Sequence, residues 1–262
     1  MSLDIRALGL DLGSTTAKIV GVDHQGCLVW HHLEQARPRV GEQAGELLER
    51  ARLASNQTER LPLVATGYGR GLVQQTTHKI TEITCHARGI FRETGHGGTL
   101  IDIGGQDSKV ILINPSGEVG DFAMSDKCAA GTGRFIENTA RRLDVPLDQM
   151  GRMAWEAEQE TPISSTCTVF AESEVISLIA HGQPLDAILR GLHRALIKRI
   201  AAMVIATGLM LPLMLSGGVA WNQAIQCMLE EEFKTKVVLP RYPQLTGAYG
   251  AALIALGSVT SQ

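Results

Sequence analysis

The sequence predicts an α/β fold made of two related halves. Residues 8–23 (LGLDLGSTTAKIVGVD) and 99–114 (TLIDIGGQDSKVILIN) both follow the order strand, Asp-x-Gly turn, strand, turn, with Asp11 and Asp102 in the same place. Strands and helices then alternate without a proline-rich linker, which is typical of α/β domains. We therefore expect two lobes, residues 1–96 and 97–262, around one nucleotide cleft, and the last helix can pack back on the N-terminal lobe.

Short apolar runs bounded by Gly, Asp or Asn predict the strands, and apolar residues at helical spacing predict the helices. In the first half, strands are expected at 7–12, 18–22, 27–33 and 63–66, and helices at 42–53 and 82–93. In the second half, strands are expected at 99–103, 109–113, 213–216 and 236–239. Helices are expected at 169–180, 185–207, 220–233 and 246–256, and a further helix is expected to begin at the turn 129–133 and to run to about 143.

Composition excludes several classes of function. The net charge is −3 and aromatic residues make up 4%, so neither a basic face for nucleic acid nor a base-stacking platform is expected. The first ten residues lack the apolar run of a signal peptide. The longest uncharged stretch, 201–218, is interrupted by Pro212 and does not read as a membrane span. We therefore expect a cytoplasmic protein with no nucleic-acid or membrane partner.

Four glycine-rich turns predict a phosphate-binding site. They lie at 11–16, 102–107, 130–133 and 216–222, after strands or before helices. Glycine lets backbone amides approach a phosphate closely, and a helix N-terminus favours negative charge. The sequence has neither a GxxxxGK[ST] loop nor a strand–GxGxxG–helix unit, so it is predicted to be neither a P-loop protein nor a Rossmann dinucleotide-binding protein.

The duplicated aspartates suggest ATP chemistry. Mg²⁺ bound to phosphates is usually held by one or two carboxylates, which Asp11 and Asp102 can supply from the two halves. Lys18 can neutralise phosphate charge, and Gln106 can orient the attacking water. The structural alternative is that each aspartate only caps its turn.

The five cysteines do not form a disulfide or zinc pattern. Cys27, in a predicted strand, and Cys227, in a predicted helix, read as packed apolar side chains, and Cys85 reads as a helix residue or a reactive thiol. Cys128 and Cys167 each stand just before a predicted helix, where a thiolate is stabilised. They are either two buried thiols or half of the ligands of a four-iron cluster, which a symmetric dimer would complete.

The motifs DLGST, DIGGQDSK and LSGGVAWN resemble the two phosphate motifs and the adenosine motif of the acetate kinase, sugar kinase, heat-shock chaperone and actin superfamily. TGAYGAAL resembles its second connecting helix, so the resemblance covers nearly the whole chain. It implies a duplicated actin-like ATPase (ribonuclease H-like) fold.

SDKCAAGTGRF and ISSTCTVFAESEV resemble the activators of 2-hydroxyacyl-CoA dehydratases and the ATPase subunits of benzoyl-CoA reductase. This resemblance implies ATP/ADP, Mg²⁺ and one 4Fe-4S cluster per homodimer, held by Cys128 and Cys167. It also implies a ferredoxin or flavodoxin as electron donor and a dehydratase or reductase as acceptor in anaerobic metabolism. The implied catalytic residues are Asp11, Asp102 and Gln106, with Glu172 as an alternative to Gln106, and the implied nucleotide-binding residues are Gly13, Ser14, Thr15, Lys18, Gly104, Gly105, Gly131, Thr132, Gly133, Gly217, Gly218 and Asn222.

The same motifs leave other functions open. A small-molecule kinase for a sugar or an acyl group would share the fold, because fold does not fix function. It would need a carboxylate that deprotonates the substrate, and the sequence offers no clear one. A redox ATPase serving a different metalloprotein, and an interaction module or actin-like polymer, are the remaining alternatives.

Overall fold

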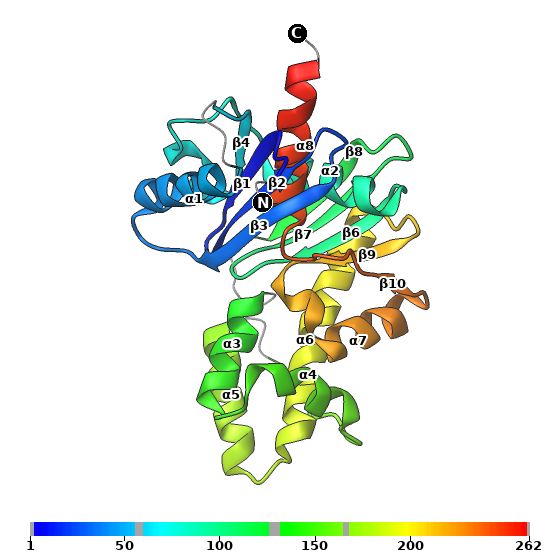
Figure 1. Cartoon of the computed structure of the whole chain (residues 1–262). Coiled ribbons are helices and arrows are strands. Elements are labelled where there is room, and N and C mark those ends of the chain that lie inside the picture. Colours follow the sequence, from blue (N-terminus) through cyan, green and yellow to red (C-terminus); the bar gives the residue numbers. More distant parts are fainter. Residues whose placement is uncertain (1–2, 56–59, 126–131, 165–167, 261–262) are drawn as a thin grey trace. The chain divides into compact units, whose positions relative to one another are not determined.

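The chain folds into two compact units. The structure, a computed structural model, describes residues 3–55, 60–125, 132–164 and 168–260 (Figure 1). Unit 1 comprises residues 1–97, 113–120 and 240–262, and unit 2 comprises 98–112 and 121–239. The described part of the chain contains no helix with the length and apolar character needed to cross a membrane.

Unit 1 is built on a five-stranded sheet in the order β3-β2-β1-β4-β5. Its strands are β1 (Ala7–Leu12), β2 (Thr16–Val22), β3 (Leu28–Gln35), β4 (Leu63–Thr66) and β5 (His78–Lys79). β2 runs antiparallel to β1 and β3, whereas β4 runs parallel to β1 and β5. All six residues of the central strand β1 are buried.

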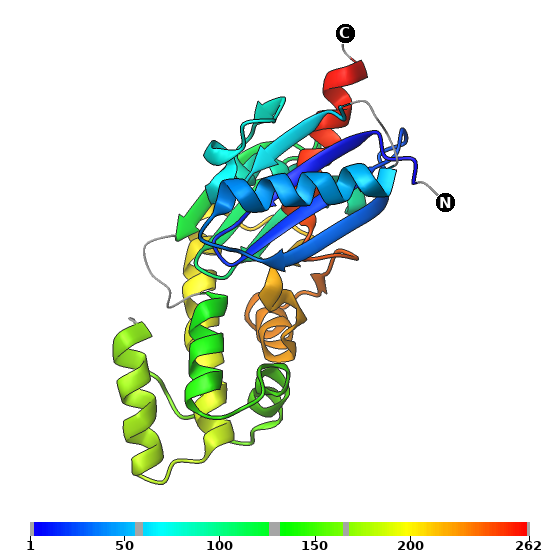
Figure 2. The same cartoon turned by 60° about the vertical axis from the view of Figure 1, so that its left-hand side comes forward.

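Helices cover both faces of this sheet, as Figures 1 and 2 show. On one face, alternate β1 residues such as Leu10 pack with Leu47 of α1 (Val40–Ser55). On the other face, Ala7 and Val20 pack with residues of α8 (Thr246–Thr260), such as Ala251, and with Cys85 of α2 (Glu82–Thr94). A strand buried on both faces tends to have a continuous apolar sequence, which explains why the sequence predicts β1 correctly.

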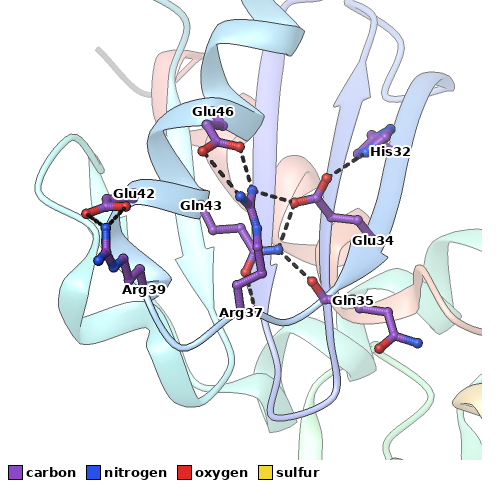
Figure 3. A network of polar contacts seen from close by, with 8 residues as sticks. All are labelled: His32, Glu34, Gln35, Arg37, Arg39, Glu42, Gln43 and Glu46. Atoms are coloured by element: carbon purple, nitrogen blue, oxygen red, sulfur yellow. Dashed lines mark hydrogen bonds and ion pairs between the residues drawn. The ribbon is translucent and has the colours of Figure 1, made fainter.

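A buried glutamine fastens the connection from β3 to α1 (Figure 3). Gln43 is 1% exposed, and its Nε2 donates to Glu34 Oε1 and to the Gln35 carbonyl, both at 2.7 Å. Its Oε1 accepts the Arg37 backbone N–H at 2.9 Å. The Gln43 amide is the largest of several contacts that hold the pKa of Glu34 below its usual value.

Replacing Gln43 by alanine should therefore lower the free energy of unfolding by about 1–3 kcal/mol, since it leaves a backbone carbonyl and a backbone amide without their partner. The neighbouring Glu42→Ala variant is the matched control, because within the described residues the Glu42 side chain bonds only to exposed Arg39, at 3.4 and 3.5 Å. Urea unfolding measures both. Equal effects of the two substitutions would contradict a specific role for Gln43.

Most of unit 2 is arranged around a second five-stranded sheet, in the order β10-β9-β6-β7-β8. The strands are β6 (Gly98–Ile103), β7 (Ser108–Ile113), β8 (Val119–Ser125), β9 (Leu213–Ser216) and β10 (Val237–Val238). The helices are α3 (Gly133–Arg142), α4 (Leu147–Glu156), α5 (Thr168–Ala180), α6 (Leu185–Thr207) and α7 (Gln223–Phe233). One core joins β6 and β9 to α4, α6 and α7, and a smaller one joins Phe135 of α3 to Val175 of α5 and Leu192 of α6.

The structure differs from the predicted elements in several places. β5, β8 and α4 were not expected. The predicted helix at 220–233 instead begins at Gln223, because a 3₁₀ turn (η2, Gly218–Trp221) comes first and the Asn222 side chain caps α7. The prediction that Cys27 packs inside a strand is wrong: Cys27 is exposed and directly precedes β3.

The two sheets repeat the same local plan, as the paired sequence segments predicted. Asp11 at the end of β1 lies opposite Thr66 of β4, and Asp102 at the end of β6 lies opposite Ser216 of β9. β4 and β9 are each followed by a left-handed glycine, Gly67 (φ 83°) and Gly217 (φ 90°). A 3₁₀ turn then follows in each unit, η1 (Tyr68–Leu72) and η2. The duplication thus includes the parallel strand and its glycine turn.

Candidate functional site

In unit 1, Asp11 is held between two glycine backbones. Its side chain is almost buried, and Lys18 Nζ lies 3.0 Å from its Oδ2. A Cβ at Gly67 would lie 2.5 Å from Asp11 Oδ1, and one at Gly247, at the start of α8, would lie 3.4 Å from Oδ2. Only glycine at Gly67 lets the backbone pass so close to the carboxylate.

The turn between β1 and β2 contains an unsatisfied polar atom. The Gly13 N–H donates to the Thr16 carbonyl at 3.1 Å, which closes the turn. The Thr15 side-chain hydroxyl is buried and has no hydrogen-bond partner in the described part of the protein. Leaving such a group unpaired costs about 1–3 kcal/mol. A phosphate oxygen is a fitting acceptor for this hydroxyl.

In unit 2, Asp102 has a partner on each oxygen. The Ser216 hydroxyl donates to Oδ1 at 2.7 Å, and Lys109 Nζ lies 3.4 Å from Oδ2. Lys109 also pairs with Asp107 Oδ2 at 2.6 Å, and its own side chain is 2% exposed. Lys109 thus stands seven residues after Asp102, as Lys18 does after Asp11. One buried ammonium group is thus shared by two buried carboxylates.

The β6–β7 turn is hydrogen-bonded directly to the start of helix α3. The Gly104 N–H donates to the Asp107 carbonyl at 2.9 Å, which closes the turn. The Gly104 and Gly105 carbonyls accept the N–H groups of Gly133 and Arg134, the first two residues of α3, at 2.8 and 2.9 Å. The first N–H groups of a helix have no partner within the helix, and two of them are satisfied here by the turn. A movement of this turn therefore acts on the start of α3.

The third turn, Gly217–Asn222, packs on the same region of unit 2. A Cβ at Gly217 would collide with the Ile103 carbonyl, and one at Gly133 would lie 3.2 Å from both Val219 Cγ2 and the Gly104 carbonyl. Asn222 Oδ1 accepts the Ile225 N–H at 3.2 Å and caps α7. The turn after β9, the β6–β7 turn and the start of α3 thus meet in one place.

The predicted site residues therefore fall into two groups. Unit 1 brings together Asp11, Gly13, Ser14, Thr15 and Lys18, and unit 2 brings together Asp102, Gly104, Gly105, Gln106, Thr132, Gly133, Gly217, Gly218 and Asn222. Gln106 is exposed, whereas Thr132 is buried. Cys128, Cys167 and Gly131, like the Glu172 side chain, lie outside the described residues.

Three buried residues of unit 2, Asp107, Lys109 and Ser216, lie in the motifs quoted above, but the sequence did not predict a role for them. Lys109 carried a usable signal, because a lysine follows each of the two aspartates at the same spacing. The partner of Ser216 could not be predicted, since its contact with Asp102 joins strands that are far apart in the sequence.

Of the three described cysteines, Cys85 is deeply buried, and burial raises the pKa of its thiol to about 12. Such a thiol is inert at neutral pH, so the alternative of a reactive Cys85 is not supported. Burial also raises the pKa of Cys227. Within the described ranges, no group of three or more His, Cys, Asp or Glu side chains is arranged to hold a metal ion.

Two aspartates at equivalent strand ends, each paired with a lysine and followed by a glycine turn, define a phosphate-handling protein of duplicated α/β architecture. The chain belongs to the BadF/BadG/BcrA/BcrD ATPase family, whose model matches residues 8–255. The expected family and the ATPase class are thereby confirmed.

Similarity to known proteins supports this family assignment. The 2-hydroxyisocaproyl-CoA dehydratase activator of Clostridioides difficile is 37% identical over 251 residues, which cover 95% of this chain and 94% of the relative. The structure of a Clostridium difficile 2-hydroxyisocaproyl-CoA dehydratase activator with bound ADPNP superposes with a TM-score of 0.89 at 36% identity, covering 97% of this chain and 96% of that one. A ROK family glucokinase from Streptomyces griseus, at 13% identity and a TM-score of 0.60 over 95% and 98% of the two chains, shares the fold alone. The predicted actin-like ATPase fold is confirmed.

Proposed function

We propose that this ATPase is an activator that uses ATP hydrolysis to deliver a low-potential electron to a 2-hydroxyacyl-CoA dehydratase or a related reductase. Two relatives support this choice by their names, the dehydratase activator of Clostridioides difficile and a benzoyl-CoA reductase component of Thauera aromatica. The direct bonds between the β6–β7 turn and helix α3 are the structural observation that carries the proposal.

The residues present suit ATP or ADP with Mg²⁺. Asp11 and Asp102 offer hard carboxylate oxygens, the ligands that Mg²⁺ prefers, directly or through water. Lys18 is placed to balance phosphate charge, and the buried Thr15 hydroxyl in the first turn has no hydrogen-bond partner among the described residues. Gln106 is exposed in the second turn, where its amide can orient a water for in-line attack on the γ-phosphate.

The bonds between the turn and the helix offer a path from ATP to the redox centre. Helix α3 begins five residues after Cys128, and its first two amides bond to Gly104 and Gly105. Loss of the γ-phosphate alters the charge that the turn faces, and the turn can transmit this change to α3 because no flexible connection separates them. On the far side, Phe135 of α3 packs with α5, the helix that follows Cys167.

Cys128 and Cys167 from two copies of the chain would hold one 4Fe-4S cluster, which supplies one-electron transfer chemistry. The chain would then work as a homodimer in the cytoplasm, with a ferredoxin or a flavodoxin as its reductant. A surface-near cluster of this kind would make the protein sensitive to oxygen.

The test is electron delivery under anaerobic conditions. Protein reduced with dithionite and freed of excess reductant is mixed with a 2-hydroxyacyl-CoA dehydratase, and its reoxidation is followed by visible absorbance. We expect reoxidation with ATP and none with ADP or with the non-hydrolysable analogue ADPNP. Nucleotide-independent reoxidation would contradict the proposal, and so would ATP-dependent phosphorylation of a sugar or an acyl acceptor, which the kinase alternative predicts.

A further inference from the structure

His193 of α6 is a buried histidine whose two ring nitrogens have different, fixed roles. The residue is 0% exposed. Its Nδ1 lies 2.7 Å from the Leu189 carbonyl, which only accepts hydrogen bonds, so Nδ1 carries the proton. Burial lowers the pKa of the ring to about 4, and the ring is therefore neutral at physiological pH. Nε2 is consequently left as an acceptor.

This acceptor fixes the side chain of Asn222. Asn222 Nδ2 lies 3.0 Å from His193 Nε2, so the amide nitrogen is the donor in this contact. The amide oxygen then faces the Ile225 N–H, which it accepts at 3.2 Å as the cap of α7. A Cβ at Gly151 of α4 would lie 2.6 Å from that oxygen, so the α4 backbone packs closely against the Asn222 amide as its third neighbour. The amide has one orientation that satisfies all of these neighbours.

Asn222 is also the end of the Gly217–Asn222 turn. Its N–H donates to the Val219 carbonyl at 2.9 Å, and the Gln226 side chain donates to the Ala220 carbonyl at 2.6 Å. Because Gly217 packs on Ile103 and Ser216 holds Asp102, the turn is continuous with the phosphate-binding part of unit 2. A rotation of the Asn222 amide would therefore disturb the turn from its C-terminal end.

We infer that His193 is a positioning residue for the nucleotide: its ring orients Asn222 and so holds the Gly217–Asn222 turn in the shape that accepts the adenosine part of ATP. His193 does not touch the nucleotide itself. This role rests on the proposed function only in that it takes this turn as a nucleotide-binding element. It also ties the turn to α6, the helix that packs against α3 and α5 through Leu192.

The experiment compares two substitutions of one residue. His193→Leu keeps a buried apolar side chain but offers no acceptor, whereas the amide oxygen of His193→Gln can still accept from Asn222 Nδ2. ADP binding in Mg²⁺ buffer is measured by calorimetry, and ATP hydrolysis gives KM and kcat. We expect the ADP dissociation constant and KM to rise about tenfold in His193→Leu, with kcat within about threefold of wild type. His193→Gln should bind ADP within about threefold of wild type.

Ile197→Ala is the matched control, because it removes another fully buried side chain of α6. It should lower the melting temperature while the ADP dissociation constant of the folded protein stays unchanged. The inference is overturned if His193→Leu also keeps wild-type ADP affinity, or if His193→Gln loses as much affinity as His193→Leu. Failure of the wild-type protein to bind ADP would instead refute nucleotide binding, a separate result.

Discussion

Replacing Lys109 by methionine is expected to lower the free energy of unfolding by about 3–5 kcal/mol, the usual cost of removing one partner from a buried ion pair. Lys109 lies 2.6 Å from Asp107 and 3.4 Å from Asp102, and its side chain is 2% exposed. Without this cation, two buried carboxylates repel each other in a medium that screens them poorly. ATP hydrolysis should fall as well, because Asp102 would keep its contact with Ser216 but lose the cation that holds its second oxygen.

Lys18→Met is the matched control for this prediction. Lys18 has the equivalent position in unit 1, but it pairs with one carboxylate and its side chain is 15% exposed. Its loss should cost clearly less stability than the loss of Lys109. Removing one of the two carboxylates as well, in Lys109→Met/Asp107→Asn, should recover part of the stability. Guanidinium unfolding gives all three values, and a Lys109→Met protein as stable as Lys18→Met would refute the account of this network.

The second large effect is expected at the crossing of α2 and α8. A Cβ at Gly250 of α8 would collide with the Cys85 carbonyl of α2, and one at Gly89 of α2 would collide with the Thr246 carbonyl. Gly250→Ala should therefore force the helices apart and destabilise the protein by about 3 kcal/mol or more, since the obstacle is a backbone atom that no rotamer change removes.

Gly257→Ala is a close control, because Gly257 lies in the same helix and a Cβ there meets nothing within 4 Å. Alanine is a better helix former than glycine, so this variant should be as stable as wild type or up to about 1 kcal/mol more stable. Thermal unfolding of both variants checks the prediction. Similar destabilisation by both substitutions would show that helix content, not the close crossing, sets the effect.

The elements that the sequence predicted well are those whose local pattern and tertiary burial agree. β1, β4, β9 and α6 have the predicted bounds, because both faces of each strand are buried and the apolar periodicity of the helix is regular. β8 was missed because most of its residues are polar, small or exposed, as suits the edge of a sheet. α4 was missed because it is short and begins with Leu147, which is half exposed.

At the candidate site, the sequence predicted the residues of the duplicated motif, but it did not predict contacts between residues that are distant in the sequence. Asp11 and Asp102 were found by their duplicated motif, and their equivalent positions are confirmed by the strand register. The partner Ser216 and the pair of His193 with Asn222 depend on contacts between distant elements. No local pattern marks such contacts, because they are set by the packing of the whole unit.

The central claim, an ATPase with an iron–sulfur cluster shared between two copies, is tested most directly by iron and sulfide analysis with EPR on anaerobically purified protein. We expect about four irons per dimer and an EPR signal on reduction. Cys128→Ser and Cys167→Ser should each abolish both, while Cys27→Ser, a substitution of an exposed cysteine, should leave both intact. An iron-free dimer after reconstitution with iron and sulfide would contradict the claim, as would full iron content in either of the first two variants.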